Sequence, residues 1–125
     1  MSVITKNDGA VAVTGASGYI GSRIVEDLLN KGYDVHACVR DVSNGKKVDH
    51  LIELGKTAPD SSLELFEGDL FEKGSYDKAF FDCVAVIHAG ATVGFNRETP
   101  QEVYDGCFTE NEHVVESIKK SGSVK

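Results

Sequence analysis

The chain has 125 residues, enough for one small domain around a single hydrophobic core. Hydrophobic residues make up 41% of it and charged residues 26%, an ordinary balance for a globular protein, and no apolar run reaches the roughly 20 residues of a membrane-spanning helix. The formal net charge of −7 disfavours binding to a phosphate backbone, so we expect neither a nucleic-acid partner nor a membrane span.

The cysteines indicate a reducing environment rather than a disulfide framework or a metal site. Cys38 and Cys83 lie in apolar, strand-like runs, which is typical of buried, reduced thiols, and Cys107 lies apart from both. Their spacing is too wide for a zinc site, so we assign no metal ligands. The N-terminal residues lack the continuous apolar segment of a secretory signal. We expect a cytoplasmic protein, or one of an organelle stroma or matrix from which a transit peptide was removed.

Apolar runs and helical periodicity alternate along the chain. Short apolar or alternating runs predict strands at residues 10–15, 34–40, 62–69 and 83–91. Apolar residues at helical spacing predict helices at residues 20–29, 45–55, 75–83 and 102–120. Glycines that follow the last apolar turn are expected to end three of these helices: Gly32, Gly55 and Gly122.

This alternation of strands and helices predicts the fold class. Parallel neighbours need a crossover between them, so the pattern indicates an α/β protein with a parallel sheet. Right-handed crossovers then give a Rossmann-type doubly wound sheet with strand order 3-2-1-4. No linker divides the chain, so we interpret residues 1–125 as a single domain.

Three glycines stand three residues apart between the first predicted strand and the first predicted helix. Gly15 allows a sharp turn, Gly18 leaves room for a pyrophosphate to approach the backbone, and Gly21 lets the helix pack closely on the sheet. The N–H groups from Ser17 to Ile20 are expected to face the anion at the positive end of the helix dipole. The alternative is a strand–helix turn that tolerates glycine and holds no ligand.

The stretch "VTGASGYIGSRIVEDLLNKGYDVHACVRD" resembles the extended short-chain dehydrogenase/reductases, and is most similar to their dihydroflavonol reductase and cinnamoyl-CoA reductase branch. The likeness continues through "LELFEGDL", "DCVAVIHAGA" and "EVYDGCFTENEHVVESIKKSG", and so covers nearly the whole chain from about residue 9. The resemblance implies a dinucleotide-binding Rossmann domain from an oxidoreductase that acts on a carbonyl or hydroxyl group of a small organic substrate.

The end of the second predicted strand bears on the choice of dinucleotide. An acid at this position accepts hydrogen bonds from the 2′-hydroxyl of NAD, whereas a guanidinium favours the 2′-phosphate of NADP. The resemblance places the phosphate clamp at Arg40 and Lys47, so we expect NADP, with NAD as the alternative because Asp41 adjoins the clamp. Taken alone, Arg40 and the pair Lys46–Lys47 are equally typical of solvated charges.

The resemblance also implies contacts along the rest of the dinucleotide. Asp69 and Leu70 are expected beside the adenine, although an aspartate after a strand is also a common turn residue. Small residues after the fourth strand are expected beside the nicotinamide ribose, and His88 is interpreted as structural. The full predicted cofactor-binding set is Gly15, Ser17, Gly18, Tyr19, Ile20, Gly21, Arg40, Lys47, Asp69, Leu70, Ala89, Gly90 and Ala91.

The sequence contains no catalytic pair of the kind the family uses. None of its four tyrosines is followed four residues later by lysine, and Cys107 falls where the family often has an asparagine, with Asn111 one turn later. We assign no catalytic residue. We expect the chain to be the N-terminal portion of a longer family domain, truncated before a fifth strand, or to rely on a protein partner that covers the open edge of residues 83–89.

Two function hypotheses follow. The first is the NADP(H)-binding portion of an oxidoreductase whose substrate site is completed by a C-terminal half. The second is a non-catalytic Rossmann-fold accessory subunit of a larger assembly. A nucleotide-sensing regulator would use the same residues as the first.

Overall fold

A computed structural model describes residues 5, 7–40, 42–43, 45–57, 61–69, 72–90 and 100–124. Within the helices, the side chains of residues 46, 47, 103, 104, 106 and 107 lie outside this description. The strands are β1 (Ala10–Thr14), β2 (Val35–Val39), β3 (Leu63–Glu67) and β4 (Cys83–His88). The helices are α1 (Tyr19–Asn30), α2 (Gly45–Thr57), α3 (Asp77–Phe80) and α4 (Pro100–Ser121).

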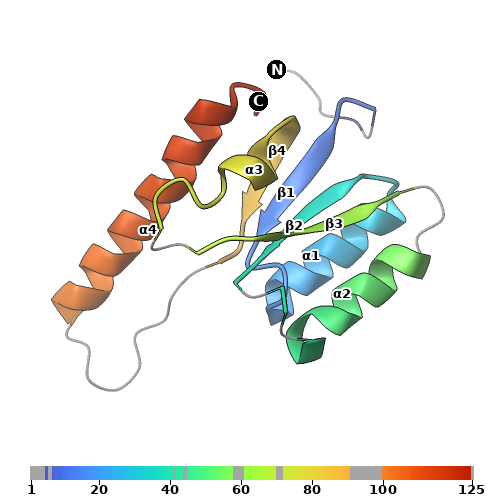
Figure 1. Cartoon of the computed structure of the whole chain (residues 1–125), viewed down its shortest axis with the longest axis horizontal. Helices are drawn as coiled ribbons and strands as arrows, with labels where there is room; N and C mark the ends of the chain where they lie inside the picture. Colours follow the sequence, from blue (N-terminus) through green and yellow to red (C-terminus); the bar gives the residue numbers. More distant parts are fainter. Residues whose placement is uncertain are drawn as a thin grey trace.

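The four strands form one parallel sheet in the order β3-β2-β1-β4 (Figure 1). The register pairs Val13 with Ala37 and Thr14 with His88, so β1, β2 and β4 finish at one edge of the sheet. The predicted α/β class, doubly wound arrangement and strand order are confirmed. Within the described residues, β4 is an edge strand.

Two apolar clusters hold the layers together, one on each face of the sheet. On one face α1 and α2 pack on the strands through buried residues such as Val25 and Leu51 (Figure 1). On the other face α3 and α4 pack through Phe80 and Val114. The sequence encodes this division because the buried residues of α1 recur at helical spacing, while the central strand β1 is apolar on both faces.

Three details differ from the sequence prediction. Helix α3 is only Asp77–Phe80, because Asp82 has a positive φ of 60° and starts β4 at the next residue. Strand β4 ends at His88, earlier than predicted. Gly55 does not end α2, which continues to Thr57; a Cβ at Gly55 would lie 2.9 Å from the Cβ of Leu63, so the glycine lets α2 pack closely on β3.

A polar contact joins α3 to α4 at the end away from the glycine turn. The carboxylate of Asp77 accepts hydrogen bonds from Ser117 Oγ and Lys120 Nζ, both at 2.8 Å. The hydrogen bond from Lys120 is the main cause that lowers the pKa of Asp77, and the bond from Ser117 adds to it. Ser117 is buried and Lys120 is exposed, so Asp77 of α3 binds α4 both inside the domain and at its surface.

We expect Asp77→Asn to lower the thermal unfolding midpoint by a few degrees near neutral pH. The folded-state pKa of Asp77 is depressed, so its ionised form adds stability above the unfolded-state value of about 3.9, and that stability is lost as the pH falls further. The difference between the variant and the parent chain should therefore vanish in acid. Glu116→Gln is the control, since its pair with Lys73 is exposed and 3.9 Å long. A difference that persists at low pH would contradict the ionic assignment.

None of the described helices combines the length and the apolar character needed to cross a bilayer.

Candidate functional site

The ends of the four strands bring the predicted site segments together at one edge of the sheet. Gly15 follows β1, Arg40 follows β2, Asp69 lies two residues beyond β3, and Ala89 and Gly90 follow β4. Backbone hydrogen bonds lock these ends to one another: Ala16 N–H donates to Cys38 O at 3.1 Å, and Gly68 N–H donates to Val39 O at 2.9 Å. In a doubly wound sheet, ligands bind at this carboxyl edge where the strand order reverses, which here is between β1 and β4.

The glycine turn depends on two glycines for its shape and leaves the third open. Gly15 has φ +63°, and a Cβ there would lie 2.6 Å from Gly90 Cα. A Cβ at Gly21 would lie 2.0 Å from Gly15 O, so only glycine allows α1 to start this close to the turn. A Cβ at Gly18 would meet only Gly15 O at 3.4 Å, so the backbone at Gly18 faces open space. Gly18 is exposed, and Ser17 beside it is half-buried in the turn.

The first turn of α1 has backbone N–H groups of the kind that can bind an anion, with one correction to the sequence prediction. Gly18 N–H is not free, because it donates to Gly15 O at 3.1 Å. The first bond of α1 runs from Ser22 N–H to Gly18 O, and no side chain caps the helix at Gly18. The N–H groups of Tyr19, Ile20 and Gly21 therefore point out of the helix end without intrahelical acceptors, at the positive end of its dipole.

Tyr19 and Ile20 present their backbone to this site while their side chains project outward, 82% and 67% exposed. They line a shallow groove of about 420 Å³ that runs along α1 beside Ile87 of β4. Its lining residues come from α1 and β4, and none of them follows β2 or β3.

Arg40 is exposed and stands directly after β2, where the sequence places the adenosine ribose. The loop after it is held to the end of β3 by Val42 N–H, which donates to Glu67 Oε1 at 3.4 Å. Lys47 lies in the first turn of α2, and its side chain is outside the described residues, as is Asp41. The structure thus places Arg40 at the expected edge of the sheet, and the role of Lys47 in the clamp stays a prediction.

The segment after β3 is packed against a buried tyrosine. A Cβ at Gly68 would lie 2.5 Å from Tyr76 Cε1, and Asp69 N–H donates to Ser75 Oγ at 2.7 Å. Burial raises the pKa of Tyr76 far above its usual range, so its phenol stays protonated, and the buried ring packs against Gly68. The predicted Leu70 lies outside the described residues.

At the end of β4, Thr14, His88 and Asn111 form a series of hydrogen bonds that the sequence analysis did not predict. Thr14 Oγ1 lies 2.6 Å from His88 Nδ1, and His88 Nε2 lies 3.0 Å from Asn111 Oδ1. Gly90 N–H donates to Thr14 Oγ1 at 3.1 Å. This agrees with the structural interpretation of His88. Ala89 and Gly90 are half-buried beside it, and Ala91 lies outside the described residues.

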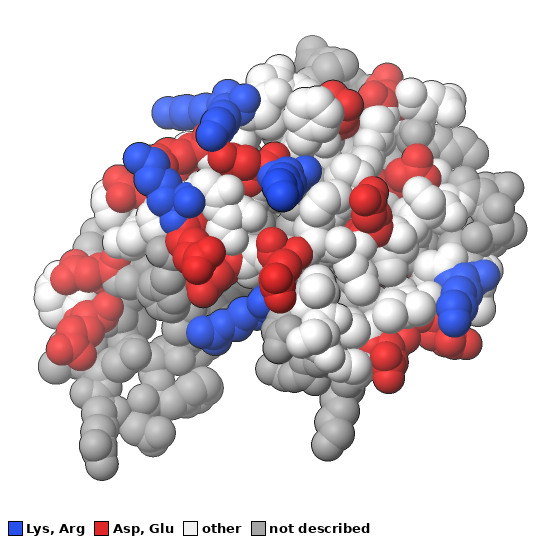
Figure 2. All heavy atoms as spheres, viewed as in Figure 1, with Lys and Arg blue, Asp and Glu red and all other residues white. Residues whose placement is uncertain are grey.

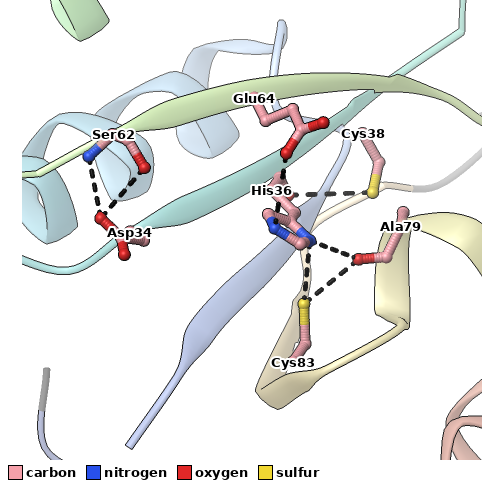
Figure 3. A network of polar contacts seen from close by, with 7 residues as sticks. All are labelled: Asp34, His36, Cys38, Ser62, Glu64, Ala79 and Cys83. Atoms are coloured by element: carbon pink, nitrogen blue, oxygen red, sulfur yellow. Dashed lines mark hydrogen bonds and ion pairs between the residues drawn. The ribbon is translucent and has the colours of Figure 1, made fainter. Parts of the chain in front are cut away.

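A second polar cluster resembles a thiol–imidazole–carboxylate triad but cannot act as one (Figure 3). Cys83 Sγ lies 3.2 Å from His36 Nδ1, and Glu64 lies 3.9 Å from the other ring nitrogen. However, His36 Nδ1 is 2.7 Å from Ala79 O, so this nitrogen carries its hydrogen to the carbonyl and cannot accept one from the thiol. Burial raises the pKa of Cys83 to about 11. The cluster fastens β2 to α3 and β4, and Cys83 is a buried, protonated thiol, as the sequence indicated.

Charge on the surface does not concentrate into one basic region on the face that Figure 2 shows. Acidic side chains are spread over the described elements there, and basic side chains lie among or beside them. With a formal net charge of −7, the positive potential for any phosphate must come from local groups: a helix N-terminus and single residues such as Arg40. No cluster of three potential metal-binding side chains occurs in the part of the chain that the structure describes.

Several known proteins are similar to this chain in sequence or in fold. A dihydroflavonol 4-reductase of Solanum lycopersicum is 42% identical over 116 residues, which is 92% of this chain and 30% of the relative. A cinnamoyl-CoA reductase of Medicago truncatula is 40% identical over 116 residues, again 92% of this chain and 35% of the relative. Gre2 of Candida albicans, solved in complex with NADPH, superposes with a TM-score of 0.75 at 27% identity, covering 93% of this chain and 35% of that one.

These matches confirm the resemblance to the dihydroflavonol reductase and cinnamoyl-CoA reductase branch. The chain spans about a third of the length of the relatives it matches. The model of the NAD dependent epimerase/dehydratase family matches residues 11–125, from the first buried strand to the end of the chain. With the glycine turn, the strand order and this match, the chain belongs to the NAD dependent epimerase/dehydratase family.

Proposed function

We propose that the chain is the NADP(H)-binding portion of an oxidoreductase that acts on a carbonyl or CH–OH group of a small organic substrate. The observation that carries this proposal is the glycine turn. Gly21 places the start of α1 so close to Gly15 that there is no room for a methyl group between them. Gly18 leaves open space beside the N–H groups of the first turn, which have no intrahelical acceptor. This arrangement suits a pyrophosphate, which needs both close backbone approach and several donors.

The other predicted residues extend this site along the carboxyl edge of the sheet. In the proposal, Asp69 lies beside the adenine, Arg40 holds the ribose 2′-phosphate, and Ala89 and Gly90 lie beside the nicotinamide ribose. The order of the strands supports this arrangement, because β3, β2, β1 and β4 present their ends in the same sequence as the parts of an extended dinucleotide. Bound there, the nicotinamide would supply or accept a hydride; the chain's own residues bind and orient it.

Arg40→Ala is expected to weaken NADPH binding by about 1–3 kcal/mol and to leave NADH binding nearly unchanged, because a charge-assisted contact with the 2′-phosphate is lost. The chain has no tryptophan, so the emission of the reduced nicotinamide can be followed directly in a titration. Arg23→Ala is the matched control, since Arg23 is also exposed but lies on α1. Equal losses for the two dinucleotides would remove the NADP assignment.

The alternative, a non-catalytic accessory subunit, is favoured by one feature of the sequence. Cys107 falls where the family often has an asparagine that organises a water near the catalytic tyrosine. The same titration separates the two functions. Saturable binding of NADPH in preference to NADH supports the oxidoreductase portion. A folded chain that binds neither dinucleotide supports the accessory subunit.

A further inference from the structure

We propose that Asn111 on α4 is a positioning residue for the dinucleotide site, acting through His88 and Thr14 on the backbone at Gly90. The inference rests on the proposed function, because Gly90 belongs to the segment assigned to the nicotinamide ribose. Asn111 lies 90 residues after Gly21, the last glycine of the turn. Its contact with His88 connects α4 to that turn across the end of β4.

The hydrogen bonds that link Gly90, Thr14, His88 and Asn111 all run in one direction. Gly90 N–H can only donate, so Thr14 Oγ1 accepts from it, and the threonine hydroxyl hydrogen is directed to His88 Nδ1. Nδ1 then accepts, and the neutral ring carries its hydrogen on Nε2, which donates to Asn111 Oδ1. Asn111 therefore selects the Nε2–H tautomer of His88, and this tautomer in turn orients the hydroxyl of Thr14.

Without Asn111, the other tautomer becomes accessible and disturbs the contact at Gly90. With hydrogen on Nδ1, His88 would donate to Thr14 Oγ1, and the hydroxyl hydrogen of Thr14 would need a new acceptor. Thr14 is completely buried, so an unpaired hydroxyl there is costly. Turning the hydroxyl to find an acceptor competes with the bond from Gly90 N–H. The result is a looser attachment of Gly90 to the end of β1.

That attachment matters because Gly90 is packed against the first residue of the glycine turn. A Cβ at Gly15 would lie 2.6 Å from Gly90 Cα, so the two backbones are in direct contact. The Thr14 hydroxyl holds them in register, because Thr14 directly precedes Gly15 and its Oγ1 accepts the hydrogen bond from Gly90 N–H. A displaced Gly90 would change the wall beside the nicotinamide half and leave the adenosine half, at β2 and β3, untouched.

The position of Asn111 makes the inference testable without unfolding the protein. Asn111 is exposed, whereas α4 packs on the sheet through other residues, among them Val114 and Ile118. Removing the amide should leave the core of the domain intact. Glu112, the next residue on α4, is also exposed and gives a control of equal placement.

The test measures the affinity of the 125-residue chain for two probes, NADPH and 2′,5′-ADP, which contains the adenosine half alone. We expect Asn111→Ala to weaken NADPH binding roughly tenfold, the loss of about one hydrogen bond, with no change for 2′,5′-ADP. Asn111→Asp, measured at pH 8, restores an acceptor for His88 and should restore the affinity. Glu112→Ala should change neither probe. Nitrogen chemical shifts of the His88 ring should show the Nε2–H tautomer in the parent chain and a mixture in Asn111→Ala.

Each outcome decides between the possibilities. An unchanged NADPH affinity in Asn111→Ala, or equal losses for both probes, would overturn the positioning role while leaving the proposed function in place. A His88 ring that keeps one tautomer in Asn111→Ala would overturn it as well. If the folded parent chain binds neither probe, the proposed function itself fails, and the role of Asn111 in binding fails with it.

Discussion

Adding one methyl group at Gly21 is expected to destabilise the fold by about 3 kcal/mol and to abolish NADPH binding. The new Cβ would lie 2.0 Å from Gly15 O, 2.8 Å from Gly15 C and 3.0 Å from Ala16 Cα. All three are backbone atoms that cannot rotate away, so the start of α1 must move off the turn. Urea unfolding followed by circular dichroism measures the loss of stability, and the NADPH titration measures the loss of binding.

Gly18→Ala is the matched variant, because it adds the same methyl group three residues earlier in the same turn. Its Cβ would meet only Gly15 O at 3.4 Å, an ordinary contact, and Gly18 has an unstrained φ of −76°. We expect a loss of stability below about 1 kcal/mol, since alanine is a poorer helix N-cap than glycine. NADPH binding should still fall, because the methyl group occupies the approach of the pyrophosphate. Normal NADPH binding by Gly18→Ala would argue that the pyrophosphate lies elsewhere.

The sheet order was predictable because its determinants are local. Each strand is a short apolar run and each helix carries its own apolar stripe, so the alternation of the two leaves few topologies once crossovers are right-handed. The glycine turn was predictable for the same reason: Gly15, Gly18 and Gly21 lie within seven residues, between one strand and one helix.

The features that the sequence did not reveal depend on contacts between distant residues. Gly32, Gly55 and Gly122 look alike in sequence, each after an apolar helical turn. Gly32 and Gly122 have positive φ values of 88° and 69° and end their helices, whereas Gly55 stays in α2 to accommodate Leu63 of the neighbouring strand. Leu63 lies only eight residues after Gly55, but the two meet because α2 folds back onto β3, which the local sequence pattern does not indicate.

The polar chain at the end of β4 is hidden in the same way. Thr14 and His88 are 74 residues apart and meet only because β1 and β4 pair in register, and Asn111 meets His88 only through the placement of α4. A sequence pattern can indicate that a histidine at a strand end is structural. The tautomer it adopts, and what that tautomer orients, require the partners on both sides of the ring.

The second large effect is expected at Gly15, where Gly15→Ala should lower the free energy of unfolding by about 3 kcal/mol and abolish NADPH binding. Two causes add. Gly15 has φ +63°, a conformation that strains any residue with a Cβ by about 1–2 kcal/mol. Its Cβ would also lie 2.6 Å from Gly90 Cα and 2.8 Å from Gly90 N, so the segment after β4 must separate from the turn. Urea unfolding and the NADPH titration again give the two readouts.

Gly122→Ala separates these two causes, because it imposes the strain without the collision. Gly122 has φ +69°, close to that of Gly15, but a Cβ there would meet nothing within 4 Å. Gly122→Ala should therefore lose only about 1–2 kcal/mol of stability and bind NADPH as the parent chain does. The excess loss in Gly15→Ala then measures the contact between the glycine turn and the end of β4. If both variants lose the same stability and Gly15→Ala still binds NADPH, that contact contributes nothing to the site, and the close approach of β1 and β4 serves the sheet alone.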